Sequence, residues 1–334
     1  MAAPISRAAL EEAAVLVHKT VAPTAQHCWP LLSARIGAEA WVKHENHTAT
    51  GAFKLRGGLV YVDGLKRREP GVAGVIAATR GNHGQSVAFA ARRAGLQAVV
   101  VVPHGNSREK NAAMKALGAE LIEFGHDFQA AYEHALGLAA ERRLHPFPSF
   151  DDALIKGVAS YSLEFLSAAP DLDVLYVPIG LGSGICGMIA ARDALGSTTE
   201  IVGVVAENAP TYALSFRAKK PVPTNSADTM ADGMACRVPV AEAVERINRG
   251  AARIVEVSDA EIEAAMRHYF TDTHNVSEGA GAAPLAAALK ERTRIAGKKI
   301  GLVLSGGNVD RDVFARVLAA GVTAEQPVRL HPSH

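Results

Sequence analysis

A lysine in unusual surroundings is the first residue with the potential for chemistry. Lys54 directly follows Phe53 and the polar stretch 46–52, and apolar residues recur from Leu55 to Leu65 at helical spacing. We therefore expect Lys54 in the first turn of a helix that begins near Phe53. The partial positive charge of a helix N-terminus disfavours an ammonium group there. A lysine with a lowered pKa forms Schiff bases with aldehydes, although a lone lysine is more often simply solvated.

A second candidate site lies between a predicted strand at 72–78 and a predicted helix at 82–94. This loop consists of Thr79, Arg80, Gly81, Asn82 and His83. Ligands bind at the carboxyl ends of parallel strands, and a helix N-terminus offers free N–H groups to an anion. The loop therefore suits a carboxylate. Without other motifs, it would pass for an ordinary turn with a capping asparagine.

A glycine-rich loop follows the strand predicted at 174–179 and opens a helix. Its residues are Gly180, Leu181, Gly182, Ser183 and Gly184. Glycine allows a close backbone approach and the helix end favours a phosphate. Gly182, Gly184 and Gly187 also satisfy the dinucleotide pattern G-x-G-x-x-G, with Glu207 after the next strand. A nicotinamide-dependent dehydrogenase is thus an alternative, but it leaves Lys54 and the Asn82 loop without roles.

A third loop ends the strand predicted at 299–304. Residues 305–308 read Ser-Gly-Gly-Asn. Glycines after strands are common, so this segment alone predicts only a turn.

Taken together, these motifs resemble a known family. Residues 46–58, 79–85, 180–184, 229–233 and 305–308 are similar, in the same order, to the motifs of the fold-type II pyridoxal-phosphate enzymes. The serine/threonine dehydratase (threonine ammonia-lyase) and serine racemase group is the best match. The similarity extends over most of the chain and is more specific for fold and cofactor than for substrate.

The resemblance implies a role for each motif. Lys54 would hold pyridoxal 5'-phosphate covalently, and Phe53 would pack beside its ring. Asn82 would contact the phenolic oxygen, while the loop 79–83 would grip the substrate carboxylate. The glycine loop 180–184 would bind the phosphate. Ser305 would bond to the pyridine nitrogen, where a neutral hydroxyl makes the ring a weaker electron sink than a carboxylate would.

Two positions depart from the family pattern. Arg80 stands where serine racemases carry the serine that acts as a second base. A guanidinium stays protonated and cannot serve as that base, so a lyase is expected in place of a racemase. Ala213 stands where metal-dependent members carry an aspartate, six residues after the acid matched by Glu207. We therefore expect no metal site, with Glu207 the single residue to consider for one.

The predicted function is the dehydration and deamination of a β-hydroxy amino acid to a 2-oxo acid and ammonia. L-Threonine and L-serine are the expected substrates, and 3-hydroxyaspartate and phenylserine are alternatives. A non-catalytic amino-acid sensor on a decayed enzyme scaffold is a further alternative, but Lys54, Asn82 and Ser305 are intact. From the length of the chain we expect no C-terminal regulatory domain like that of the biosynthetic threonine dehydratases.

Composition limits the class of protein. The chain has 334 residues, 49% of them apolar, and a net charge of +1, which suits a large globular protein without a nucleic-acid or membrane partner. The N-terminus has no basic segment followed by an apolar one, so we expect no secretory signal. Cys28, Cys186 and Cys236 show no paired spacing. We expect a cytoplasmic protein. Its partners are predicted to be an amino-acid substrate and copies of itself, in a homodimer or higher oligomer.

These motifs need an α/β scaffold to bring them together. Strands and helices alternate from residue 72 onward, which predicts parallel sheets. We expect a large cofactor-binding domain of residues 1–71 and 148–334, a small α/β domain inserted at 72–147, and the cofactor between them. Residues 21–32 are predicted to be extended and residues 210–231 irregular. The polar tail 326–334 is expected to fray.

Overall fold

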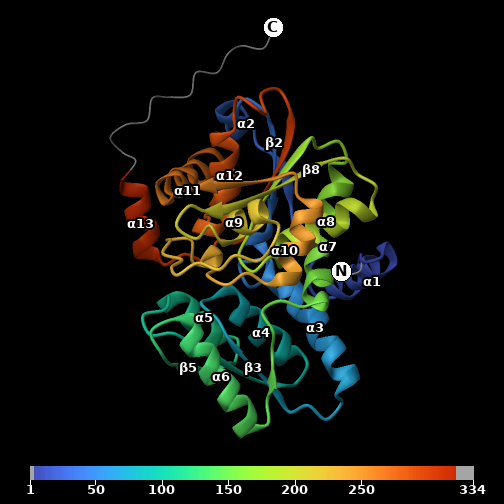
Figure 1. Cartoon of the computed structure of the whole chain (residues 1–334), viewed down its shortest axis with the longest axis vertical. Coiled ribbons are helices and arrows are strands. Elements are labelled where there is room, and N and C mark those ends of the chain that lie inside the picture. Colours follow the sequence, from blue (N-terminus) through green and yellow to red (C-terminus); the bar gives the residue numbers. More distant parts are fainter. Residues whose placement is uncertain (1–3, 321–334) are drawn as a thin grey trace.

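The chain folds around two open sheets, one above the other in Figure 1. The computed structural model describes residues 4–320. The larger sheet has the strand order β1-β2-β10-β7-β8-β9 and is parallel except where β1 meets β2. Its strands are β1 (Gln26–Cys28), β2 (Glu39–His44), β7 (Val174–Pro178), β8 (Glu200–Ala206), β9 (Arg253–Val257) and β10 (Lys299–Leu304). The predicted α/β fold with mainly parallel sheets is confirmed.

Helices cover both faces of the larger sheet. Alternate residues of a strand point to opposite faces, and in β7 Tyr176 packs in one core while Leu175 and Val177 pack in another. The first core contains α2 (Pro30–Ile36), α11 (Asp259–Thr273) and α12 (Gly279–Lys290). The second contains α7 (Asp152–Ala168), α8 (Ser183–Ala194), α9 (Thr211–Ala218) and α10 (Ala241–Gly250). Two further helices, α1 (Arg7–His18) and α13 (Arg311–Ala319), lie at the ends of the described chain.

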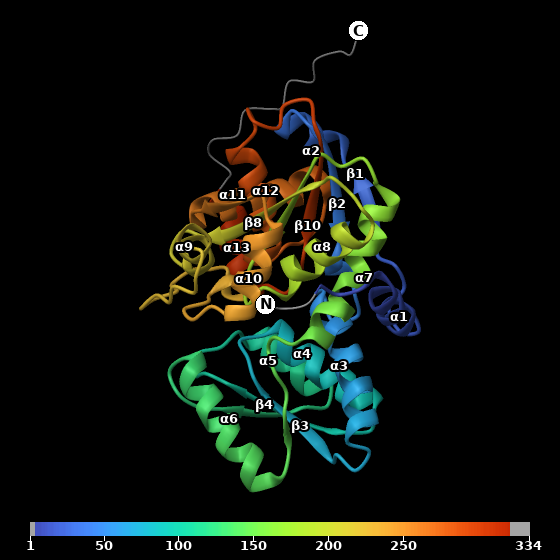
Figure 2. The ribbon, with the colours of Figure 1, turned by 45° about the vertical axis from the view of Figure 1, so that its right-hand side comes forward.

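The smaller sheet is built from consecutive βαβ units. Its order is β5-β4-β3-β6 and all its pairs are parallel. The strands are β3 (Gly74–Ala78), β4 (Gln97–Val102), β5 (Glu120–Glu123) and β6 (His145–Pro146), and the helices are α4 (Asn82–Arg93), α5 (Arg108–Ala116) and α6 (Phe128–Arg142). Figure 2 shows this unit beneath the larger sheet. It falls within the predicted insertion 72–147, whose boundaries stay a prediction.

One helix joins the two units. In α3 (Lys54–Arg68), Tyr61, Val62 and Leu65 pack into the core of the smaller sheet. At its other end, the N–H of Phe53 donates to the carbonyl of Ser305, directly after β10, at 3.1 Å. The first turn of α3 is therefore fixed at the junction between the sheets (Figure 1).

Two segments differ from the prediction. Residues 21–32 are not wholly extended, because α2 begins at Pro30, and proline fits the first turn of a helix without losing a needed N–H. Residues 210–231 are not wholly irregular, because α9 occupies 211–218 directly after Pro210. Its buried face, which includes Tyr212 and Ala213, is stabilised by tertiary packing. The predicted frayed tail at 326–334 lies outside the described residues. Within residues 4–320, no helix has the length and apolar character to span a bilayer.

Candidate active site

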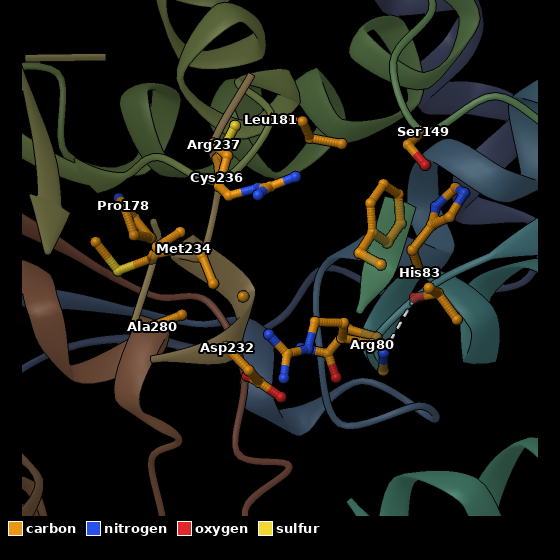
Figure 3. Close-up of a pocket in the computed structure, with 18 of the residues that line it drawn as sticks. Arg80, His83, Ser149, Pro178, Leu181, Asp232, Met234, Cys236, Arg237 and Ala280 are labelled. Carbon is orange, nitrogen blue, oxygen red and sulfur yellow. Dashed lines mark hydrogen bonds between the residues drawn. The ribbon is translucent and has the colours of Figure 1, made fainter. Parts of the chain in front are cut away.

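A cavity of about 450 Å³ lies at the junction of the two sheets. Its lining includes the ends of β3 and β7, the residue after β10, the first turns of α3, α4 and α8, and residues 225–228 and 232–238 (Figure 3). The predicted site residues that line it are Phe53, Lys54, Thr79, Arg80, Gly81, Asn82, His83, Gly180, Leu181, Gly182, Ser183, Gly184 and Ser305. The loops chosen from sequence therefore converge on one space. Glu207 is not among the lining residues.

Lys54 lies in this cavity with a polar partner and an aromatic neighbour. Its Nζ donates a hydrogen bond to Ser183 Oγ at 3.0 Å and lies 4.9 Å from the centre of the Phe53 ring. Burial lowers the pKa of the Lys54 ammonium to about 8. The lowered pKa agrees with the prediction, but its cause is the loss of surrounding water and not the helix end. The amine is thus more available as a nucleophile at neutral pH.

The backbone before Lys54 is fixed against the loop after β10. Ala52 pairs with Gly306 in an isolated bridge, and Phe53 bonds to Ser305. Thr48 reinforces this turn, since its Oγ1 accepts from Ala52 N at 3.0 Å. Ser305, itself buried, is thereby held in register with the first turn of α3. Lys54 and Ser305, which are 251 positions apart (305 − 54), are thus held next to each other by backbone hydrogen bonds.

The glycine loop forms a close-fitting cradle at the start of α8. Gly182 has a φ of 101°, which favours glycine, and a Cβ added at Gly180 would lie 2.2 Å from the carbonyl oxygen of Gly233. The first intrahelical bond runs from Cys186 N to Gly182 O, so the preceding N–H groups have no acceptor within the helix. This end of α8 can bind an anion.

Tyr212 supports the cradle and was not identified from the sequence. Its hydroxyl donates to the carbonyl of Leu181 at 2.8 Å and accepts from Val240 N at 3.2 Å. Tyr212 belongs to α9, in the segment predicted to be irregular. Tyr212 could have been found from the sequence only by first predicting α9.

Asn82 occupies the first position of α4 with its amide already oriented. Its Nδ2 donates to Glu278 Oε1 at 2.6 Å, and its Oδ1 accepts from Asn308 Nδ2 at 2.9 Å. The first intrahelical bond of α4 runs from Gln85 N to Gly81 O, which leaves the earlier N–H groups for an anion. The neighbouring His83 stays neutral, because burial lowers the pKa of its imidazole to about 3.

Three charged residues form what we call the cavity cluster: Lys110, Asp232 and Glu278. Asp232 belongs to the motif at 229–233, whereas Lys110 and Glu278 were not identified from the sequence. Lys110 Nζ lies 2.6 Å from Asp232 Oδ2 and 3.1 Å from Glu278 Oε2. Burial and the nearby Asp232 raise the pKa of Glu278 despite Lys110. Lys110 comes from α5 of the smaller unit, and both acids come from the larger one. The cluster therefore joins the two units at the cavity wall.

A second group of charges lies under α3, and we call it the α3 cluster: Lys43, Glu45, Arg56 and Glu164. Arg56 donates to Glu45 Oε2 at 2.7 Å and to Glu164 Oε1 at 2.6 Å, and Lys43 Nζ lies 2.6 Å from Glu164 Oε2. The Arg56, Glu45 and Lys43 side chains are fully buried. Arg56 is two residues from Lys54 in the motif, so this cluster anchors the helix turn that carries the lysine.

The sequence offered Glu207 as a weak candidate for a metal ligand. Among residues 4–320, no group of three or more histidine, cysteine or acidic side chains is arranged to hold a metal ion. Glu207 directly follows β8, and its backbone N–H donates to the carbonyl of Val257, the last residue of β9. Its predicted weak candidacy as a cation ligand stays a prediction.

Comparison with known proteins gives concordant matches. The family described as "Pyridoxal-phosphate dependent enzyme" matches residues 17–306. The L-threonine ammonia-lyase of Thermotoga maritima is 33% identical over 316 residues, covering 94% of this chain and 78% of that protein. The L-threonine ammonia-lyase of Geobacter sulfurreducens is 36% identical over 297 residues, covering 87% and 73%. A solved pyridoxal 5'-phosphate-dependent aspartate racemase has a TM-score of 0.86 and 30% identity, covering 92% of this chain and 97% of that one.

Proposed function

The chain belongs to the pyridoxal-phosphate dependent enzymes, and from this premise we propose that it deaminates a β-hydroxy amino acid of the L-threonine or L-serine type. The net reaction converts the amino acid into a 2-oxo acid and ammonia. The water lost with the β-hydroxyl is recovered when the released enamine is hydrolysed. Family membership also removes the dehydrogenase alternative, because it assigns the glycine loop to a different cofactor.

The cavity residues fit pyridoxal 5'-phosphate. The cradle at Gly180 and Gly182 has no room for a side chain, and the N-terminus of α8 above it suits a phosphate. The Lys54 amine, with its lowered pKa, suits an aldehyde. In our proposal Phe53 would pack beside the ring, Asn82 would contact its phenolic oxygen and Ser305 would bond to its nitrogen.

When bound, the cofactor supplies an electron sink that makes the α-hydrogen of an attached amino acid acidic. The residues of this chain supply the rest. Lys54 takes the α-proton as a general base, and its burial keeps the amine partly neutral near pH 8. The N–H groups at the start of α4 orient the substrate carboxylate. Ser305 would offer the ring nitrogen a neutral hydroxyl, which would make the ring a weaker electron sink than a carboxylate partner would.

The proposed reaction is elimination without racemisation. Racemisation requires a proton donor on the face of the substrate opposite Lys54. Arg80 occupies the position of the racemase serine, and its guanidinium does not release a proton at physiological pH. Chiral chromatography of a reaction begun with L-serine tests this point. D-Serine formed as fast as pyruvate would exclude it.

The observation that carries the proposal is the Lys54 amine, which lies 3.0 Å from Ser183 at the phosphate cradle. Purified holoenzyme should release ammonia and a 2-oxo acid from L-threonine and L-serine. Borohydride reduction followed by peptide mass spectrometry should place the cofactor on Lys54, and Lys54→Ala should lose turnover. An adduct on another lysine would overturn the assignment. A loaded enzyme inert toward all four candidate substrates would favour the sensor alternative.

A further inference from the structure

The Arg80 side chain lines the cavity, but the proposed reaction on threonine gives it no binding role. We propose that Arg80 binds a carboxylate on the substrate side chain, so that the enzyme prefers β-hydroxy amino acids with an acidic side chain. The smallest such substrate is 3-hydroxyaspartate. This inference rests on the proposed function and specifies its substrate class.

The position of Arg80 supports this role. It lies in the loop between β3 and α4, and its exposed side chain lines the cavity. Figure 3 shows its guanidinium directed into the cavity, on the same side as Asp232. Within residues 4–320 it forms no hydrogen bond or ion pair. A guanidinium with five unpaired donors faces the space where the substrate must lie.

The other cations of the lining already have partners. Lys54 is assigned to the cofactor, and Lys110 is held between Asp232 and Glu278. Arg237 lies across the cavity from Arg80 (Figure 3), donates to Asn225 O at 3.4 Å and acts on Asp127 through its charge. Arg80 is therefore the cation left to meet an anion brought by the substrate.

The loop 79–83 was predicted to bind the α-carboxylate, and in this proposal its backbone does so without the Arg80 side chain. The N–H groups at the start of α4 lack intrahelical acceptors and suit the α-carboxylate from the backbone. Asp232, the acid labelled beside Arg80 in Figure 3, is already paired with Lys110 at 2.6 Å. A planar guanidinium matches a second carboxylate in two parallel hydrogen bonds, whereas the methyl group of threonine offers it no acceptor.

The reaction balances with this substrate. 3-Hydroxyaspartate loses its α-proton to Lys54 and its β-hydroxyl as water. Hydrolysis of the resulting enamine returns that water, and the products are oxaloacetate and ammonia. No oxidant or reductant is needed. Arg80 keeps its proton throughout and acts as a binding residue only.

The kinetic test measures ammonia release from L-threonine and from the threo and erythro isomers of L-3-hydroxyaspartate. Wild-type holoenzyme should show the higher kcat/KM with a hydroxyaspartate isomer. Arg80→Ser should lower that value by about 10- to 100-fold, the range for a lost hydrogen bond to a charged group, with threonine changed by less than about threefold. Arg80→Lys should keep part of the preference. Arg93→Ser, at the exposed far end of α4, the helix that follows the Arg80 loop, should leave both values unchanged.

A binding test separates substrate recognition from turnover. L-Aspartate and L-asparagine have the same shape and no β-hydroxyl to lose, and they differ in the side-chain charge. Calorimetry should show tighter binding of aspartate to wild type and equal binding of the two by Arg80→Ser.

The outcomes separate the two proposals. If threonine is turned over while hydroxyaspartate gains nothing from Arg80, the substrate class is wrong and the proposed function stands. An equal loss on both substrates in Arg80→Ser also rejects the inference, since Arg80 would then serve the shared α-carboxylate. If no β-hydroxy amino acid is turned over, the proposed function fails. The aspartate preference and its loss in Arg80→Ser then decide the binding role alone.

Discussion

The α3 cluster and the cavity cluster are both buried groups of charges near Lys54, but they are built differently. In the α3 cluster two cations face two acids, and Arg56 bridges Glu45 and Glu164 with hydrogen bonds of 2.6 to 3.2 Å. In the cavity cluster one cation, Lys110, faces Asp232 and Glu278. The charges of the α3 cluster balance, and its residues come from β2 and the residue after it, α3 and α7. The cavity cluster joins the two units and has one more acid than base.

The pKa directions follow from this difference. Burial would raise the pKa of Glu164, but Arg56 and Lys43 outweigh it and lower that pKa. At Glu278 burial and Asp232 outweigh Lys110, and the pKa is raised. In the α3 cluster every charge has an oppositely charged partner. Removing one partner leaves an unpaired buried charge, which is costly, so the cluster holds the helix turn of Lys54 in place. In the cavity cluster one cation faces two acids, so Glu278 can take up or release a proton when a ligand binds in the cavity.

The strongest test of the comparison is Arg56→Met. It leaves Glu45 and Glu164 without their main partner in a fully buried site, so we expect a loss of about 3–5 kcal/mol in the free energy of unfolding. Denaturant unfolding of the purified variant measures this. The matched control is Arg67→Met on the same helix, whose exposed pair with Asp63 should contribute less than about 1 kcal/mol. Similar losses in both variants would refute the special role of the α3 cluster.

Lys110→Met should have a smaller and pH-dependent effect. It leaves Asp232 and Glu278 facing each other, but Asp232 is 30% exposed and Glu278 can take up a proton. We expect a loss of about 1–3 kcal/mol near pH 8, less than for a fully buried pair. Lys115→Met, an exposed change on the same helix, is the control.

The sign of the pH dependence is fixed by Glu278. Its pKa is raised above the usual 4.5 in the folded state and rises further without Lys110. Between 4.5 and the raised pKa, the folded state binds more protons than the unfolded state, so stability falls as pH increases. The destabilisation by Lys110→Met should therefore be smaller near pH 5 than near pH 8. A loss independent of pH would show that Glu278 does not titrate.

The sequence predicted the residues of the site that do the chemistry better than the residues that hold them in position. Lys54, Asn82 and Ser305 were recognisable because each lies in a short motif at a strand or helix end. Lys110 and Glu278 were not, because they are 168 positions apart, as 278 − 110 shows, and meet only in the folded chain. The alternation of strands and helices identified both sheets. It missed α9, because Pro210 and the proline-containing loop beyond it mask a short helix that packing stabilises.

Lys54 differs from both clusters, since no acid among residues 4–320 contributes to the shift of its pKa, which burial alone lowers to about 8. The neutral fraction of its amine should rise about tenfold from pH 7 to pH 9. Capture of pyridoxal phosphate by apoenzyme, followed by absorbance, should accelerate accordingly and level off above pH 8. An exposed lysine would continue to accelerate beyond pH 10. Between about pH 8 and 10.5 the folded apoenzyme binds fewer protons here, so stability increases with pH in that window.

The smallest expected effect concerns another junction between the two units. Asp310, directly before α13, accepts from Ser107 Oγ at 2.5 Å and from the N–H groups of Arg108 and Glu109 at 3.3 Å, all at the start of α5. In return, Glu109 Oε1 accepts from Arg311 N at 2.9 Å. Each helix thus caps the other.

Asp310→Ala removes half of this reciprocal cap and should cost about 0.5–2 kcal/mol, the usual range for a lost helix cap. Because the contact joins α5, which carries Lys110, to the larger unit, amide exchange should accelerate first at the start of α5. Asp312→Ala removes an exposed pair with Arg108 and is the control, with an expected cost of less than about 1 kcal/mol. Faster exchange across the whole smaller sheet would mean that this cap, and not the cavity cluster, is the main connection between the two units.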